Sequence, residues 1–164
     1  IMKDLTPRFV TPRSCNNARP DPEVCATSPQ MIYLLDTNVC IHLLNGTQTH
    51  LLHHIRQRSP ADIALCSIVK AELLSGARRS QRVESNLQRL KAFFAPLQSL
   101  SFDDACAEHY GQIQADLLTQ GKPIGPNDTL IAATARAHKA TLVTHNTAEF
   151  GRVPHLRVED WERI

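Results

Sequence analysis

From residue 31 onward, short apolar runs alternate with segments in which apolar residues recur at helical spacing. Four strands are expected from the runs, at 31–35, 62–66, 97–102 and 140–144. Six helices are expected between them, at 39–44, 49–57, 68–77, 81–94, 103–120 and 128–138. Nearly continuous apolar strands are typical of a parallel sheet that is buried on both faces. The alternation therefore predicts an α/β fold with a central parallel sheet and helices on both sides, in three layers.

Capping and turn residues set the expected boundaries of these elements. Asp36 and the two residues after it are good helix starters, and Asn45-Gly46 is a typical helix end. Ser67 is expected to cap the helix that follows the second strand. Two prolines and two glycines within 121–127 predict a loop there, so that Asp128 opens the last long helix.

The first thirty residues have a different composition. Five prolines fall between Thr6 and Pro29, among Ser, Thr, Asn and Arg, and apolar residues show no sustained period. Such a segment buries too little apolar surface to offset the entropy of ordering it. We therefore expect residues 1–30 to be a disordered N-terminal extension and residues 31–164 to be one domain. Met31, directly before the first strand, would suit a natural start.

The composition of the chain limits its cellular setting but does not indicate a specific function. The chain has 164 residues, 42% of them hydrophobic, and a net charge of +2. It offers no run near the roughly 20 apolar residues of a membrane span, so no membrane association is expected. Five cysteines lie far apart without a CxxC pair, which favours a reducing, cytoplasmic location with Cys40, Cys66 and Cys106 as core residues.

Three acids fall at the expected ends of strands or the starts of helices. Asp36 follows the first strand, Glu72 lies about one turn into the helix after the second, and Asp128 follows the 121–127 loop. Ligands of open α/β sheets bind at the carboxyl ends of the strands, so these acids could meet in one cleft. Each also has a simpler interpretation, since Asp36 and Asp128 could only cap helices and Glu72 could be a surface acid.

Converging carboxylates repel one another, by roughly 4 kcal/mol for a pair at 4 Å and an effective dielectric of 20. A bound cation relieves that repulsion. Oxygen ligands without a matching cysteine or histidine set favour Mg²⁺, with Mn²⁺ as a second choice. Such a metal activates water and stabilises charge on a phosphodiester, so metal-assisted hydrolysis is the expected chemistry.

Four sequence motifs, in this order, resemble those of the PIN domain. They are Met31-Ile-Tyr-Leu-Leu-Asp-Thr-Asn-Val39, Ala71-Glu-Leu-Leu-Ser-Gly76, Pro123-Ile-Gly-Pro-Asn-Asp-Thr-Leu-Ile-Ala-Ala133 and Thr141-Leu-Val-Thr-His-Asn-Thr-Ala-Glu-Phe150. The closing residues 157–161 fit as well. Among PIN domains the chain is most similar to the VapC-type ribonuclease toxins of bacterial toxin–antitoxin pairs, over essentially all of residues 31–164.

The resemblance implies a metal-dependent endoribonuclease, a cognate antitoxin that blocks its site, and commonly a homodimer. It assigns Asp36, Glu72 and Asp128 to the first three acids of the family. The usual fourth acid is replaced here by Asn146, which removes one negative charge and leaves open whether one or two metals bind.

Secondary candidates surround these acids. Thr37 and Asn38 could orient Asp36 or bind a phosphate, although both also start a helix. Asp116 is a further acid near the 121–127 loop, with a solvated helix face as its simpler interpretation.

Arg78, Arg79 and Arg82 form the best basic cluster and could hold RNA phosphates, but a solvated helix end explains them equally well. Aromatic residues are only 5% of the chain, so a stacking platform for single-stranded RNA is poorly supported. The leading prediction is thus a cytoplasmic Mg²⁺-dependent endoribonuclease toxin. The alternative is a weakly active or inactive PIN-like module that binds RNA or protein.

Overall fold

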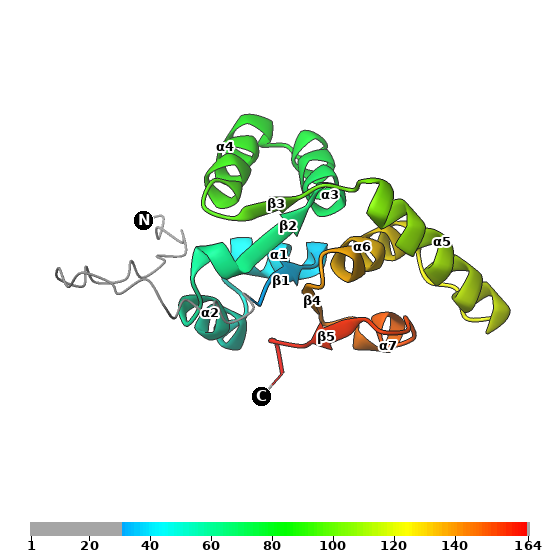
Figure 1. The fold of residues 1–164 in the computed structure, drawn as a ribbon. Coiled ribbons are helices and arrows are strands. Elements are labelled where there is room, and N and C mark those ends of the chain that lie inside the picture. The colour runs from blue at the N-terminus through cyan, green and yellow to red at the C-terminus, as the bar shows by residue number, and fades with distance from the viewer. Residues whose placement is uncertain (1–30, 164) are drawn as a thin grey trace, which may run out of the picture.

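The computed structural model describes residues 31–163, which form a five-stranded parallel sheet surrounded by helices (Figure 1). The strands are β1 (Tyr33–Leu35), β2 (Ile63–Cys66), β3 (Gln98–Leu100), β4 (Thr141–Val143) and β5 (Arg157–Glu159). Their order across the sheet is β3-β2-β1-β4-β5, and each neighbouring pair is parallel. The expected extension at 1–30 lies outside the described residues.

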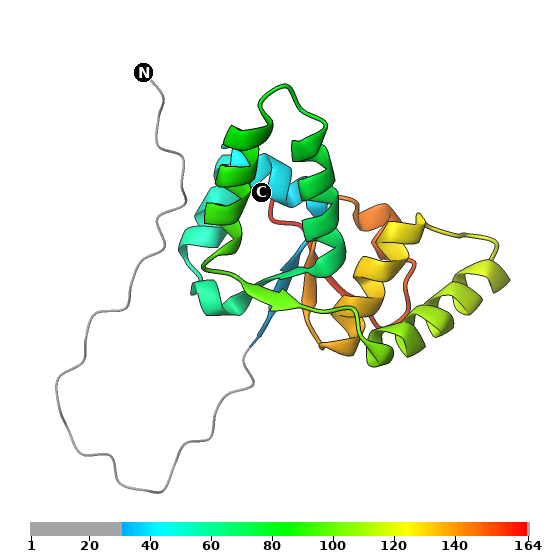
Figure 2. The ribbon, with the colours of Figure 1, turned by 90° about the horizontal axis from the view of Figure 1, so that it is seen from above.

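Helices occupy the connections between the strands. They are α1 (Thr37–Asn45), α2 (Thr49–Arg56), the 3₁₀ helix η1 (Pro60–Asp62), α3 (Ser67–Arg78), α4 (Val83–Phe94), α5 (Asp104–Thr119), α6 (Pro126–Ala137) and α7 (Thr147–Phe150). Both views draw α5, α6 and α7 on one side and α2 and α4 on the other (Figures 1 and 2). The predicted three-layer α/β fold with a parallel central sheet is confirmed.

The strand order reverses beside β1. The chain runs outward from β1 to β2 and β3, then returns to β4 on the other side of β1 and continues to β5. Because connections between parallel strands are right-handed, these two directions place their helices on opposite faces. The two faces separate at the carboxyl ends of β1 and β4, where open α/β sheets bind ligands.

The core lies on both faces of the central strands. Leu34 and Leu35 of β1 and Leu142 and Val143 of β4 have no exposed surface. Burying each such side chain stabilises the fold by about 1.5–3 kcal/mol. Cys40, Cys66 and Cys106 are buried free thiols, which confirms their prediction as core residues.

The predicted helix starts at 39, 68, 81, 103 and 128 are each wrong by one or two residues, since the helices begin at Thr37, Ser67, Val83, Asp104 and Pro126. Ser67 is the first residue of α3 rather than its cap, and its hydroxyl donates to the Leu100 carbonyl at 3.3 Å, tying α3 to β3. The last long helix begins at Pro126, inside the predicted loop, with Gly125 as its cap. Proline is favoured at a first helical position, because its missing N–H has no partner there in any case.

The C-terminal part of the chain holds two elements that periodicity did not predict. These are the one-turn helix α7 and the edge strand β5, which the sequence analysis treated only as motif residues. Both are too short for a helical or alternating pattern to emerge. Among residues 31–163, no helix has the length and apolar character needed to cross a membrane.

Candidate active site

Asp36 lies at the carboxyl end of β1, where the strand order reverses. Its side chain is 5% exposed, and its backbone N–H donates to the Val143 carbonyl at 3.0 Å, which fixes the residue against β4. One carboxylate oxygen accepts the Thr37 N–H at 2.7 Å and the other accepts the Thr144 hydroxyl at 2.8 Å. Burial raises the pKa of Asp36, the two hydrogen bonds lower it, and the charges of Glu72 and Glu162 raise it further.

Glu72 reaches the same region from α3. Its Oε2 accepts a short hydrogen bond from the Thr37 hydroxyl, and its Oε1 accepts the Asn127 side-chain amide at 2.7 Å. Thr37 therefore links Glu72 to Asp36, since its backbone N–H binds one acid and its hydroxyl binds the other. Asn127 connects Glu72 to the first turn of α6, directly beside Asp128.

Asp128 completes the group from the first turn of α6. Its pKa is raised from 3.8 to about 6, first by burial and then by the charges of Asp36, Glu149 and Glu72. Gly125 leaves room for this carboxylate, because a Cβ at Gly125 would lie 3.0 Å from an Asp128 oxygen. The three predicted acids therefore act on one another electrostatically, although they come from β1, α3 and α6.

A fourth acid, Glu149, was missed by the sequence analysis. It lies on α7, and its carboxyl contacts that of Asp128, where the hydrogen bond and the negative charge both raise the pKa of Asp128. Asn146, in the position of the usual fourth acid, is the residue that precedes α7, and its backbone N–H donates to the Thr144 hydroxyl. Glu149 lies three residues later, so helical spacing from Asn146 was the signal that could have identified it.

The remaining candidates lie around this group. Asn38 is exposed on the first turn of α1, and Asp116 is exposed on α5. Within residues 31–163, no hydrogen bond or ion pair joins Asp116 to the other acids. Arg78, Arg79 and Arg82 are all exposed where α3 ends and α4 begins, so they form a basic surface.

The carboxylate oxygens of these acids suit a hard divalent cation, but they do not surround a metal ion by themselves. Among the described residues, no three Asp, Glu, His or Cys side chains lie close enough together to hold a metal by themselves. Mg²⁺ commonly uses one or two carboxylates and keeps several waters, so it does not require such a cage. The mutual repulsion that raises the pKa of Asp128 is the kind that a cation would relieve.

Sequence comparisons identify the family of this chain. The family model described as the PIN domain matches residues 33–156. Ribonuclease VapC2 of Rickettsia felis is 39% identical over 134 residues, which cover 81% of this chain and all of the relative. The tRNA(fMet)-specific endonuclease VapC of Shigella flexneri is 39% identical over 132 residues, covering 79% of this chain and 97% of the relative.

Structural comparisons lead to the same family. The crystal structure of DNA-bound VapBC from Salmonella typhimurium matches with a TM-score of 0.76 and 36% identity, over 80% of this chain and 98% of that one. VapBC2 from Rickettsia felis bound to a promoter DNA fragment matches with a TM-score of 0.74 and 38% identity, over 80% and 99%. The chain belongs to the PIN-domain family and, within it, to the VapC ribonucleases.

Proposed function

We propose that this chain is the endoribonuclease toxin of a toxin–antitoxin pair and that it hydrolyses RNA in an active site formed by Asp36, Glu72 and Asp128. The observation that carries the proposal is that these acids share one partly buried region, where burial first and then the charges of Asp36, Glu149 and Glu72 raise the pKa of Asp128 to about 6. Structural ion pairs lower carboxyl pKa values, whereas like charges held together are a feature of functional sites. Glu149 supplies the fourth carboxylate in place of Asn146.

Asp36, Asp128 and Glu72 would hold Mg²⁺, or Mn²⁺, with one or two of their carboxylates bound directly and waters completing the coordination. When bound, such an ion lowers the pKa of water and stabilises charge on a phosphodiester. Neighbouring groups keep the acids in position. The Thr144 hydroxyl and the Thr37 backbone N–H hold Asp36, while the Thr37 hydroxyl and the Asn127 side-chain amide hold Glu72. Their hydrogen bonds go to carboxylate oxygens and keep those oxygens as acceptors.

RNA would approach over the basic surface formed by Arg78, Arg79 and Arg82. Exposed arginines bind phosphates through charge-assisted hydrogen bonds, and such contacts position a substrate without reading its sequence. Because a relative with 39% identity is named a tRNA(fMet)-specific endonuclease, tRNA is the first substrate class to test.

An antitoxin would block the same acids. A groove of about 270 Å³ is lined by Glu72 and other polar side chains, Arg89 among them, and by apolar side chains of α1, α3 and α4 that include Leu44 and Ile41, which is 40% exposed. An antitoxin segment with apolar residues for the groove and an arginine for the acids would fit both features. We expect Asp36→Asn to weaken this complex at least several-fold in a binding titration, and an unchanged dissociation constant would contradict this mode. A homodimer, common in the family, is expected from sedimentation of the free toxin.

The test is cleavage of a mixed RNA pool that includes tRNA, by the full chain freed of antitoxin. The reactions contain Mg²⁺, Mn²⁺ or EDTA, and a parallel set uses Asp128→Asn. We expect discrete cuts that require both the metal and Asp128. A folded protein that makes no cut with either metal would overturn the proposal.

The alternative, a weakly active or inactive RNA- or protein-binding module, is not favoured. Its main support was Asn146, and Glu149 supplies a carboxylate beside Asp128. The relatives at 39% identity are named as a ribonuclease and an endonuclease. The cytoplasm remains the proposed place of action, consistent with the free thiols of Cys40, Cys66 and Cys106.

A further inference from the structure

A stack of ring systems lies near the other end of β1, away from Asp36. We call Tyr33, His54, Arg58 and Trp161 the aromatic stack. The rings of His54 and Trp161 are nearly parallel, with centroids 5.3 Å apart, and those of Tyr33 and Trp161 are tilted at 5.0 Å. The Arg58 guanidinium lies 4.2 Å from the centre of the Trp161 ring and 4.6 Å from that of Tyr33. The fold thus gathers the single tryptophan and one of two tyrosines, a grouping that the low aromatic content did not predict.

Arg58 is the fixed cation of this stack. One of its amino groups donates to the His54 carbonyl at 2.9 Å, which holds the guanidinium plane against the rings. Burial, together with the charges of Arg58 and His53, lowers the pKa of His54, so that ring is neutral at neutral pH. A guanidinium held in this way keeps further N–H groups for a ligand.

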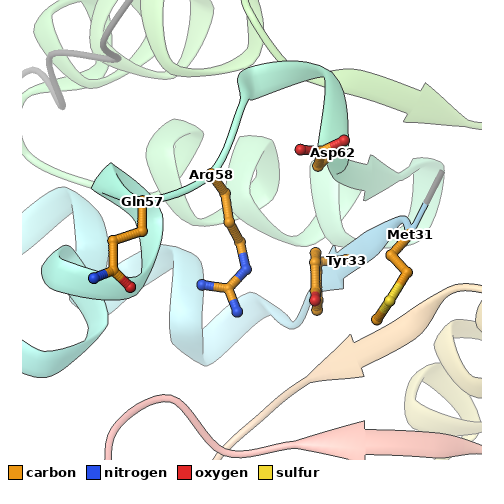
Figure 3. Close-up of a pocket in the computed structure, with 5 residues that line it drawn as sticks. All are labelled: Met31, Tyr33, Gln57, Arg58 and Asp62. Atoms are coloured by element: carbon orange, nitrogen blue, oxygen red, sulfur yellow. The ribbon is translucent and has the colours of Figure 1, made fainter. Parts of the chain in front are cut away.

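A hollow of about 410 Å³ adjoins the stack, lined by Met31, Tyr33, Gln57, Arg58 and Asp62. Figure 3 shows Tyr33 between Arg58 and Met31, with Asp62 above the ring and Gln57 at the end of α2. This volume falls in the range of small-molecule sites, roughly 300–1,000 Å³. The lining combines an aromatic ring and a guanidinium with an amide, beside the carboxylate of Asp62.

We propose that this hollow binds one unpaired nucleobase of the RNA, an inference that rests on the proposed endoribonuclease function. Single-stranded RNA is recognised by stacking bases on aromatic rings and guanidinium planes and by hydrogen bonds to the base edges. Tyr33 and Arg58 supply the planes, and Gln57, whose amide nitrogen lies 2.9 Å from the His53 ring nitrogen, supplies its amide oxygen for a base edge. A peptide partner fits less well, since the large exposed apolar side chains of residues 31–163 are Met31, Ile41 and Leu118, and just one of them lines the hollow.

The hollow lies within reach of the acids. Tyr33 precedes Asp36 by three residues on β1, a separation of about 10 Å along the strand. The C-terminal residues connect the two regions, because Trp161 belongs to the stack and the adjacent Glu162 binds His42 of α1 at 2.8 Å. A base held here would set a nucleotide preference at a fixed distance from the cut.

Trp161 is the only tryptophan of the chain, so its fluorescence reports on this stack. The first experiment titrates the full chain with GMP, AMP, CMP and UMP, and with ribose 5-phosphate as the probe that lacks a base. We expect a saturable change with at least one nucleotide and none with ribose 5-phosphate. Arg58→Lys keeps the charge but loses the plane, and it should weaken binding roughly 5-fold or more.

Arg56→Lys is the matched control, since Arg56 is exposed on α2 and does not line the hollow. Its affinity should equal that of the unchanged chain. No response to any nucleotide, an equal response to ribose 5-phosphate, or equal affinities of the two arginine variants would overturn the proposal. So would a response to an antitoxin alone that depends on Arg58, because the hollow would then belong to a protein partner.

A second experiment maps RNA cut sites by sequencing for the unchanged chain, Arg58→Lys, Gln57→Ala and Arg56→Lys. We expect Arg58→Lys and Gln57→Ala to flatten the base preference at one fixed offset from the cut, while Arg56→Lys keeps it. Identical preferences in all four would contradict the proposal. If the unchanged chain cuts no RNA, the proposed function fails, and the nucleotide titration still decides the hollow on its own.

Discussion

The two ends of β1 have opposite electrostatics, although three residues separate them. At the carboxyl end, Asp36 belongs to a group of like charges that, together with the larger effect of burial, raises the pKa of Asp128. At the other end, Tyr33 lies in a stack where Arg58 provides a favourable cation–π contact. The carboxyl end is destabilised by repulsion among its own carboxylates, whereas at the other end the charge of Arg58 is stabilised by aromatic rings of the same chain.

This difference shows which end the fold depends on. Repulsion between carboxylates lowers stability, so a group of acids is retained for what it binds rather than for the fold. The aromatic stack buries Trp161 to 2% exposure and joins β1, α2 and the C-terminal residues. Substitutions at the two ends should therefore have opposite effects on stability, and the following predictions test that.

The largest effect is expected at the stack. Trp161→Ala should lower the free energy of unfolding by about 3–5 kcal/mol, because it leaves a cavity between β1 and α2. Urea unfolding followed by circular dichroism measures this, and Trp161→Phe should lose less because a ring remains. A loss below about 1 kcal/mol for Trp161→Ala would show that the stack is not a structural anchor.

At the acid end, Glu149→Gln should reduce RNA cleavage about 10- to 100-fold, the range seen when groups that support a metal site are lost. The substitution keeps the shape of the side chain and removes its charge beside Asp128. Glu84→Gln, at an exposed position of α4, serves as the control and should leave the rate unchanged. Equal rates for the two variants would remove Glu149 from the site.

A smaller loss, about 10-fold, is expected for Thr144→Val, because Asp36 then loses a buried hydrogen bond of 2.8 Å. Thr144→Ser keeps the hydroxyl and should retain most of the activity. The comparison uses cleavage rates at saturating Mg²⁺. If the two variants have the same rate, the hydroxyl does not position Asp36.

The smallest expected effect is a gain in folding stability, for a substitution of Asp128. The pKa of Asp128 is about 6 in the folded chain, above its ordinary 3.8, so the folded state binds the proton more tightly and stability falls as pH rises between these values. Asp128→Asn removes a charge that is partly buried and repelled by its neighbours, and it should stabilise the metal-free protein at pH 7 by about 1 kcal/mol, after allowance for solvent screening.

Thermal unfolding in EDTA checks this change. The gain should vanish below about pH 4, where the carboxyl is protonated in both the folded and the unfolded state. A gain that is independent of pH, or a loss of stability at neutral pH, would contradict the assignment of Asp128 to a repulsive cluster.

Much of the fold could be predicted because its strands and helices are regular. The apolar runs before Asp36 and at 140–144 identified the two central strands, and Gly46 ends α1 as expected, in the left-handed region at φ 64°. Helix starts were less certain, since Pro126 suits both a loop and a first helical position. The edge strand β5 has three residues, too few to show alternation.

Candidate site residues could be predicted where their own place in the sequence indicates a role, and not where the role depends on contacts between distant segments. Asp36, Glu72 and Asp128 each follow a recognisable element, and the structure brings their charges together. Glu149 was missed because its role depends on how α7 packs, and Arg58 because its partner Trp161 is about a hundred residues away in sequence. Contacts of such long range leave no local pattern.

The Thr144 hydroxyl acts as a hydrogen-bond donor toward Asp36. It accepts the Asn146 N–H at 3.0 Å, so its own proton is available for Asp36, whose oxygen must accept it. The other Asp36 oxygen faces the Thr37 N–H, which can only donate. Each Asp36 carboxylate oxygen thus already accepts one hydrogen bond, so a proton added to either oxygen would lie beside an existing donor. These two donors favour the carboxylate form of Asp36 and lower its pKa, against burial and the neighbouring acids, which raise it. The donors belong to the residue that follows β4 and to the first residue of α1, so the backbone of two elements sets which Asp36 lone pairs remain for a ligand.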